Sequence, residues 1–292
     1  MILLDDAQSS AAKPSSRLYD VPLQSWCILP SGDLTQDQGA IGQCLAEIQQ
    51  ALKQGHYVVA AFAYELGRFI HQLSPRDNSA THPLIEAWSF ASHQTLSKKK
   101  VDTFLEQELK NLGSEEIIAG VLDVAESITQ EKFTEDIDRI QEYIRNGDTY
   151  QINHTYRITG KTYGSPLALY SKLRKRQPGR FGAYIAQMNS NGNRYLLSQS
   201  PELFIQKQGD ILKAMPMKGT ANALSSGASA LSEDPKNQAE NVMIVDLLRN
   251  DLSRISLPGT VSVPNLFEVA RHGDVLQMTS TVQGQIKPST SL

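Results

Sequence analysis

The sequence predicts an α+β protein that combines short antiparallel strands with helices. Three observations support this class. An apolar helical pattern over residues 41–53 is followed directly by an apolar strand over residues 57–64. Four short β-type runs follow one another between residues 181 and 217, separated by Gly, Asn and Ser as in an antiparallel sheet. A long apolar helix then begins at Asp234.

Composition excludes several classes of function. The 292 residues suffice for one large domain or two smaller ones, and the net charge of -3 gives no basic surface for a nucleic acid. The longest apolar run, residues 57–64, is too short to span a membrane. The two cysteines show neither disulfide nor zinc spacing, which favours a reducing compartment. We therefore expect a cytoplasmic protein with no nucleic-acid and no membrane partner.

The N-terminal part begins with the helix over residues 41–53, which Gly55 ends, and the buried strand over residues 57–64. Between residues 89 and 123 the composition becomes polar. We interpret the run of three lysines at 98–100 as a solvated linker and residues 101–112 as a surface helix. A boundary near residue 125 would divide the chain into an N-terminal subdomain, 1–125, and a second region, 126–292.

The second region begins with a helix whose apolar residues, from Phe133 to Ile144, recur on one face, and Asn146-Gly147 ends it. A strand is expected next over residues 150–159. The four β-type runs of the predicted sheet then cover residues 181–188, 194–198, 203–207 and 211–217. Small residues over 221–232 predict a loop.

The last predicted helix, residues 235–252, has Asp234 as its N-cap and Pro235 at its first position. Apolar residues cover nearly its whole circumference, which predicts a buried helix. Buried charges need partners, and Asp246 can reach Arg249 or Asn250 on the next turn. Glu240 has no such local partner by this reasoning. It is either a carboxylate that the helix dipole favours or a ligand of Mg²⁺.

Two further residues are candidates for catalysis. Lys218 precedes Gly219 and Thr220 in a strand-to-loop turn, where glycine allows a ligand to approach closely. A lysine becomes a nucleophile only when its amine loses its proton, and most lysines beside a glycine are simply solvated. Glu202 stands at a turn sixteen residues earlier. If the strands between them pair, both side chains emerge near one end of the sheet, although a turn glutamate is usually solvated.

Five motifs resemble those of the chorismate-utilising enzymes. They are Gly147-Asp-Thr-Tyr-Gln-Ile-Asn153, Ser198-Gln-Ser-Pro-Glu-Leu-Phe204, Pro216-Met-Lys-Gly-Thr220, Ala239-Glu-Asn-Val-Met-Ile-Val-Asp-Leu-Leu-Arg-Asn-Asp251 and the segment 276–282. The resemblance implies two packed antiparallel sheets with outer helices. It also implies a site for chorismate and Mg²⁺ between those sheets.

The resemblance is strongest to the members that convert chorismate and ammonia to 4-amino-4-deoxychorismate for folate and para-aminobenzoate synthesis. It implies that Lys218 attacks C2 of chorismate while Glu202 assists departure of the 4-hydroxyl. Ammonia, supplied by a partner glutamine amidotransferase, then attacks C4. The resemblance further implies that Glu240 binds Mg²⁺ and that Gly219 and Thr220 bind a substrate carboxylate. Gln277 stands where many relatives have a histidine, and it can still form hydrogen bonds with substrate.

Two comparisons within the family favour this activity over isochorismate formation and over anthranilate formation, which stays an alternative. Anthranilate-forming relatives have alanine at the position of Lys218, and isochorismate-forming relatives have a lysine base at that of Gln151. Relatives with a tryptophan pocket often hold serine or proline near the positions of Asp5 and Arg180, so we expect no tryptophan binding. The family continues beyond the length of this chain. We therefore expect the region 126–292 to be a chorismate-binding catalytic region that is incomplete at its C-terminus. A noncatalytic, truncated chorismate-binding module is the remaining alternative.

Overall fold

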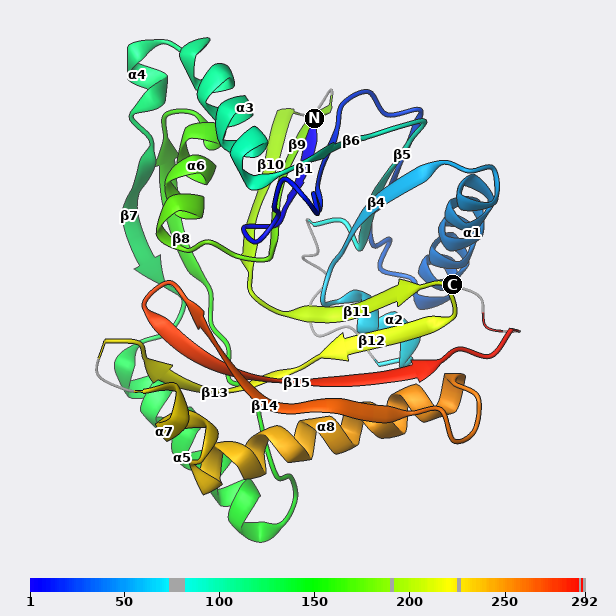
Figure 1. The fold of residues 1–292 in the computed structure, drawn as a ribbon, viewed down its shortest axis with the longest axis vertical. Coiled ribbons are helices and arrows are strands. Elements are labelled where there is room, and N and C mark those ends of the chain that lie inside the picture. Colours follow the sequence, from blue (N-terminus) through cyan, green and yellow to red (C-terminus); the bar gives the residue numbers. More distant parts are fainter. Residues whose placement is uncertain (74–81, 190–191, 225–226, 289, 291–292) are drawn as a thin grey trace. The chain divides into compact units, whose positions relative to one another are not determined.

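A computed structural model describes residues 1–73, 82–189, 192–224, 227–288 and 290. The chain divides into two compact units (Figure 1). The first comprises residues 1–102 and 174–292, and the second comprises residues 103–173. The predicted boundary at residue 125 falls inside the second unit, within strand β7 (Gly120–Glu126). The division at that residue stays a prediction.

A five-stranded antiparallel sheet in the first unit joins the chain's N-terminus to its middle. Its strand order is β10-β9-β1-β2-β6. The strands are β1 (Ile2–Asp5), β2 (Ser16–Tyr19), β6 (Gln94–Leu96), β9 (Phe181–Asn189) and β10 (Gly192–Ser200). The hairpin of β9 and β10 confirms two of the runs predicted from the sequence.

A three-stranded antiparallel sheet, in the order β3-β5-β4, packs against helix α1 in the same unit. Its strands are β3 (Gln24–Ile28), β4 (Tyr57–Phe62) and β5 (Ile85–Phe90), and the short helix α2 (Leu66–Ile70) follows β4. Helix α1 (Leu34–Lys53) ends where the sequence predicts but begins seven residues earlier than residue 41. The earlier start has a clear cause, because the Asp33 side chain accepts a hydrogen bond from the Gln36 N–H and caps the helix there.

The second unit holds a two-stranded antiparallel sheet and helices. Its elements are α4 (Ser114–Ile117), β7, α5 (Gln130–Asn146) and β8 (Ile158–Tyr163), while α3 (Lys98–Lys110) and α6 (Pro166–Arg176) carry the chain into and out of it. Gly147, at φ 78°, ends α5 as predicted. The three lysines at 98–100 are exposed but form the first turn of α3, so the expected linker is wrong. The predicted strand over 150–159 is also wrong for residues 150–157, because ladder pairing with β7 begins only at Ile158.

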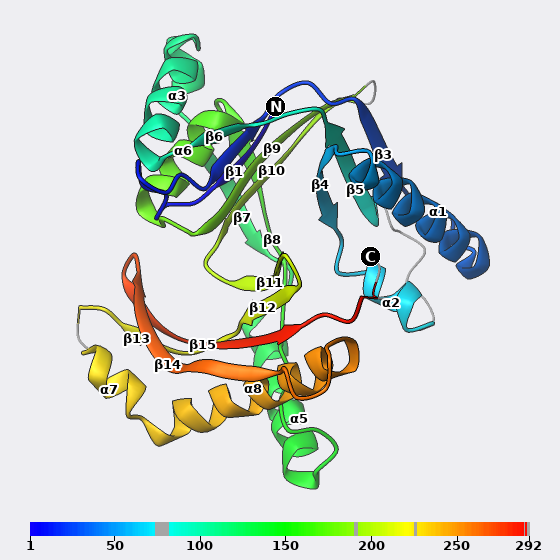
Figure 2. The ribbon, with the colours of Figure 1, turned by 45° about the vertical axis from the view of Figure 1, so that its right-hand side comes forward.

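A third sheet of the first unit carries the candidate site (Figure 2). Its order is β11-β12-β15-β13, with β14 on the other edge of β15. The strands are β11 (Leu203–Gln208), β12 (Ile211–Met215), β13 (Met217–Asn222), β14 (Ser262–His272) and β15 (Val275–Gln285). The run predicted as one strand over 211–217 is divided at Pro216, which has no N–H for a ladder hydrogen bond.

Helices α7 (Ala228–Ser232) and α8 (Pro235–Ile255) cover one face of this sheet, and α8 runs along it in both views (Figures 1 and 2). Helix α7 occupies part of the predicted loop 221–232. Asp234 caps α8 by accepting from the Asn237 N–H, as predicted. The expected complete burial of α8 is wrong. Val245 and Leu252 are buried against the sheet, whereas other apolar residues of α8 stay exposed because only one side of the helix has a sheet to cover.

Candidate functional site

Lys218 lies on a β-bulge at the start of β13. Met217 pairs with Thr279 of β15 and Thr220 pairs with Gln277, so three steps along β13 oppose two steps along β15. One extra residue is therefore inserted at Lys218–Gly219, and such a bulge redirects the chain and its side chains locally. Lys218 is half-buried there. The strand-to-loop turn predicted for this position is wrong, because Lys218 and Gly219 lie inside the paired strand β13.

Gly219 makes the bulge sterically feasible. Its φ of +90° lies in the region that side chains disfavour. A Cβ at this position would lie 3.1 Å from Cβ and 3.2 Å from Oδ1 of Asn237, in the first turn of α8. The backbone of β13 thus packs closely on the beginning of the helix that carries Glu240.

Glu202 reaches the bulge from the neighbouring hairpin. It stands directly before β11, and Leu203 pairs with Met215 of β12, which brings Glu202 alongside the start of β13. The carboxylate Oε1 accepts a hydrogen bond of 2.9 Å from the N–H of Met217. Strand pairing therefore brings the exposed Glu202 next to the residue that precedes Lys218.

Glu240 lies on α8 with 45% of its side chain exposed, and Lys236 lies four residues before it. The Lys236 Nζ is 3.9 Å from Oε1 of Glu240, so the inference that Glu240 lacks a local partner is wrong. An exposed ion pair of this length contributes only about 0–1 kcal/mol to the free energy of unfolding. It also leaves the carboxylate of Glu240 accessible. The other local pair was predicted correctly, because Arg249 Nη1 lies 2.8 Å from Asp246 Oδ1.

Thr220 and Gln277 face each other as a cross-strand pair of β13 and β15. Thr220 is exposed and Gln277 is half-buried. The side-chain oxygen Oε1 of Gln277 is buried and has no hydrogen-bond partner among the described residues. A buried amide oxygen without a partner is costly, so Oε1 of Gln277 is an acceptor whose hydrogen bond is left unmade among these residues. Gln151, the position that distinguishes isochorismate-forming relatives, lies in the second unit.

The carboxylates near the bulge fit a hard cation only in a limited way. Within the described ranges, no three or more His, Cys, Asp or Glu side chains gather closely enough to form a metal-binding cluster. Glu240 offers one accessible carboxylate. Mg²⁺ is commonly held by one or two carboxylates, with water and substrate oxygens completing its shell, so this arrangement fits an ion that arrives with substrate.

The sequence reasoning missed Asn241 and Ser280, which lie behind the bulge and are both 0% exposed. Their side chains are joined by a hydrogen bond from Ser280 Oγ to Asn241 Oδ1. A usable signal was present, because an asparagine four residues after Asn237 interrupts the apolar side of a helix.

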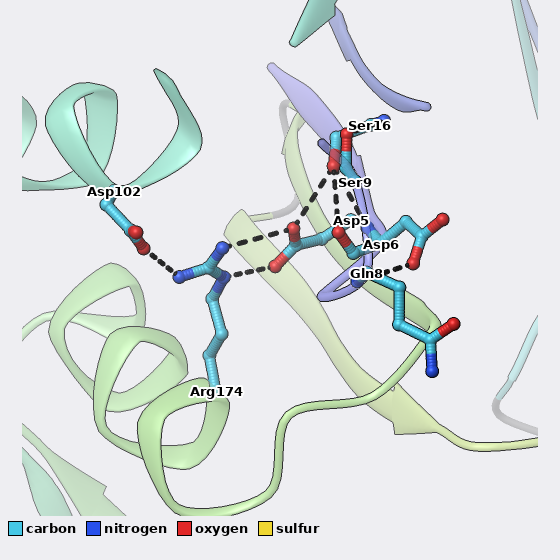
Figure 3. Close-up of polar contacts among 7 residues, drawn as sticks. All are labelled: Asp5, Asp6, Gln8, Ser9, Ser16, Asp102 and Arg174. Atoms are coloured by element: carbon cyan, nitrogen blue, oxygen red, sulfur yellow. Dashed lines mark hydrogen bonds and ion pairs between the residues drawn. The ribbon is translucent and has the colours of Figure 1, made fainter. Parts of the chain in front are cut away.

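A second polar cluster in the first unit surrounds Arg174, which is buried (Figure 3). Its guanidinium forms ion pairs with Asp5 and Asp102, and Ser16 donates to Asp5 Oδ1 at 3.4 Å. Burial alone would lower the pKa of Arg174, but the hydrogen bonds and charges of the two aspartates outweigh it and raise the pKa. Asp5, which the sequence linked to the altered tryptophan pocket, is thus a member of a buried ion pair. Arg180 is half-buried, and its ring contact is with Phe181.

Comparison with known proteins identifies the family. The model of the chorismate binding enzyme family matches residues 31–292. The chain is 39% identical over 171 residues to aminodeoxychorismate synthase, chloroplastic, of Arabidopsis thaliana, covering 56% of this chain and 18% of that protein. It is 35% identical over 166 residues to anthranilate synthase component 1 of Streptomyces coelicolor, covering 55% of this chain and 32% of that protein. The matches thus span about a third or less of these relatives.

A solved structure agrees with the fold. Anthranilate synthase component I from Streptococcus pneumoniae superposes with a TM-score of 0.74 at 20% identity, covering 97% of this chain and 71% of that chain. This likeness confirms the α+β class with antiparallel sheets. In the described part of the chain, no helix combines the length and apolarity needed to cross a membrane. With the family model matching most of its length, the chain belongs to the chorismate binding enzymes.

Proposed function

We propose that this chain provides the catalytic residues of an aminodeoxychorismate synthase component I, which converts chorismate and ammonia to 4-amino-4-deoxychorismate. The observation that carries the proposal is the contact of the Glu202 carboxylate with the Met217 N–H, one residue from Lys218. This contact places the candidate acid beside the residue that precedes the candidate nucleophile. The similarity to an aminodeoxychorismate synthase supports the same activity.

In the proposed first step, the unprotonated Nζ of Lys218 forms a bond to C2 of chorismate. The two conjugated double bonds of the ring shift, the C4–O bond breaks, and Glu202 gives its proton to the departing oxygen, which leaves as water. Ammonia then attacks C4, the double bonds shift back, and the C2–N bond breaks so that the lysine is released. The amine and the carboxylic acid return to their starting states after the protons are redistributed.

The remaining residues bind the substrate. Gly219 would contact a substrate carboxylate through its backbone at the bulge, Thr220 offers a hydroxyl, and the unpaired Oε1 of Gln277 offers an acceptor. Glu240 would hold Mg²⁺, which neutralises substrate carboxylate charge when bound. Ammonia would come from a partner glutamine amidotransferase. Both cysteines are free thiols, which suits a reducing cytoplasm.

Mass spectrometry of the covalent intermediate tests the proposal. The protein is incubated with chorismate and Mg²⁺ in the absence of ammonia. We expect the mass of the peptide that contains Lys218 to increase by the mass of chorismate minus that of water. Lys218→Ala should abolish the adduct and the amination, whereas Lys207→Ala, a change at an exposed lysine of β11, should leave both intact. Absence of the adduct from an enzyme that turns over chorismate would refute the covalent mechanism.

The second candidate is anthranilate formation, which the similarity to an anthranilate synthase component 1 favours. Lys218 argues against it, because the resembling anthranilate-forming enzymes have alanine at this position. Product analysis distinguishes the two, since anthranilate is fluorescent and 4-amino-4-deoxychorismate is not aromatic. Chorismate binding without any turnover would instead support the noncatalytic alternative.

A further inference from the structure

Two asparagines one helical turn apart hold the beginning of α8 against the sheet. Asn237 and Asn241 are four residues apart and therefore share a face of the helix. Asn237 packs on Gly219 of β13, where an added Cβ would come within 3.1 Å of it. The Oδ1 atom of Asn241 accepts a 2.5 Å hydrogen bond from Ser280 Oγ of β15. Helix α8 thus contacts both strands that form the bulge, by packing on β13 and by a hydrogen bond to β15.

Ser280 connects three elements at this point. Its hydroxyl donates to Asn241 and accepts a 3.2 Å hydrogen bond from the N–H of Phe267, which lies on β14 at a second bulge. Its main-chain N–H donates to the carbonyl oxygen of Pro216 at 3.1 Å. A serine hydroxyl has one hydrogen to donate, and here it is used on Asn241. Because of the bond to its main-chain N–H, any shift of Ser280 would also move Pro216, the residue directly before β13.

A chain of contacts consequently links Glu202, the candidate acid, to the residue that follows Glu240, the candidate Mg²⁺ ligand. The Glu202 carboxylate accepts a hydrogen bond from the Met217 N–H, and the carbonyl of the preceding Pro216 accepts one from the Ser280 N–H. The Ser280 hydroxyl is bound to Asn241, which is the next residue after Glu240. Lys218 follows Met217 directly, so these contacts fix the backbone that precedes the proposed nucleophile.

Stability alone is a weak reason for a polar pair at this place. Both residues are 0% exposed, and Nδ2 of Asn241 has no partner among the described residues. A buried donor without a partner is costly, and two apolar side chains of similar shape can replace a buried hydrogen bond with little loss. A hydrogen bond restricts the distance and the angle between the helix and the strand, whereas an apolar pair does not.

We propose that Asn241 and Ser280 are positioning residues, which fix the Glu240 end of α8 relative to the bulge that carries Lys218. Neither residue is required to touch substrate. The expected effect on turnover rests on the proposed function. The effect of the Asn241–Ser280 hydrogen bond on the bulge can be measured without any substrate.

The experiment combines hydrogen exchange with steady-state kinetics in Asn241→Ala, Ser280→Ala and the double variant. Ser253→Ala serves as the control, because Ser253 is an exposed serine of the same helix whose hydroxyl donates to a carbonyl within that helix. We expect each single variant to exchange amide hydrogens faster over residues 214–222. We also expect kcat to fall by about 10- to 100-fold, since small misplacements of reacting groups have effects of this size.

Two features separate positioning from general destabilisation. The KM for chorismate should change less than kcat, and the double variant should lose about as much kcat as either single variant, because both changes break one link. Ser253→Ala should match the unchanged protein in both measurements. If the alanine variants do not fold, Ser280→Cys and Asn241→Asp replace them, with kcat expected to be lower than in the unchanged protein.

Unchanged exchange over 214–222 in folded variants would overturn the inference, as would unchanged kcat or single effects that multiply in the double variant. If the unchanged protein makes no 4-amino-4-deoxychorismate, the proposed function fails. The exchange measurement then still decides whether the two residues hold the bulge.

Discussion

The carboxylate of Glu202 accepts a hydrogen bond of 2.9 Å from the main-chain N–H of Met217, fifteen residues further along the chain. The contact depends on the antiparallel pairing of β11 with β12, which turns the chain back on itself. It gives Glu202 a fixed position beside the strand that carries Lys218. A turn glutamate that would otherwise be a solvated charge is thereby oriented at the candidate site.

Glu202→Gln should separate the two roles of this side chain. The amide oxygen can still accept from Met217, so the free energy of unfolding should stay within about 0.5 kcal/mol of that of the unchanged protein. The amide cannot donate a proton to the leaving hydroxyl, so kcat should fall by about 10²- to 10⁴-fold. Steady-state rates with chorismate and ammonia provide the measurement. Glu233→Gln, at the exposed end of α7, is the control, and a comparable loss there would contradict the assignment.

Gly219→Ala should destabilise the protein. The φ of +90° costs a side chain about 1–2 kcal/mol, and the 3.1 Å approach to Asn237 adds an overpacking cost of about 1–3 kcal/mol. Urea unfolding gives the change directly. Gly227→Ala is the matched control, because its φ is -81° and nothing lies within 4 Å of the added Cβ. Equal stability of the two variants would show that the bulge tolerates a side chain.

Arg174→Met should lower the free energy of unfolding by about 3–5 kcal/mol, because it leaves the buried carboxylate of Asp5 without a compensating charge. Denaturant titration checks this value. The double variant Asp5→Asn with Arg174→Met should be more stable than Arg174→Met alone, since no buried charge remains unpaired. Arg176→Met, at an exposed position of the same helix, should change stability little. A mild effect of Arg174→Met would show that water reaches Asp5.

Stability should decrease as the solution becomes acidic, partly because of His272. Burial, and then the charge of Arg180, lower the pKa of His272 below its ordinary value of 6.5. The unfolded chain therefore binds a proton below about pH 6.5 that the folded protein resists, so the free energy of unfolding falls as the pH falls through that range. His93 contributes in the same direction, through burial and then Arg17.

The measurement is the free energy of unfolding between about pH 7.5 and pH 5. His272→Gln should remove part of the slope, because glutamine does not titrate. An identical slope in His272→Gln would mean that the folded protein accommodates a protonated His272.

Local sequence signals predicted the elements that are specified locally. Helix α5 ends at Gly147 and helix α8 begins after Asp234, because a left-handed residue and a side-chain cap act within a few residues. The apolar periodicity gave a wrong prediction where tertiary contacts determine which side chains are buried. The apolar circumference of α8 predicted burial on all sides, but only one sheet face is available to cover it, so Val242 remains 39% exposed.

Five motifs in the amino-acid sequence were enough to identify the family, and they made Lys218, Glu202 and Glu240 candidates for the site. The bulge at Lys218 and the hydrogen bond from the preceding residue to Glu202 became visible only in the folded chain. The link between Asn241 and Ser280 was likewise outside the reach of sequence reasoning. The physical reason is the same in each case, because register shifts and hydrogen bonds between distant segments depend on strand pairing, which no local pattern encodes.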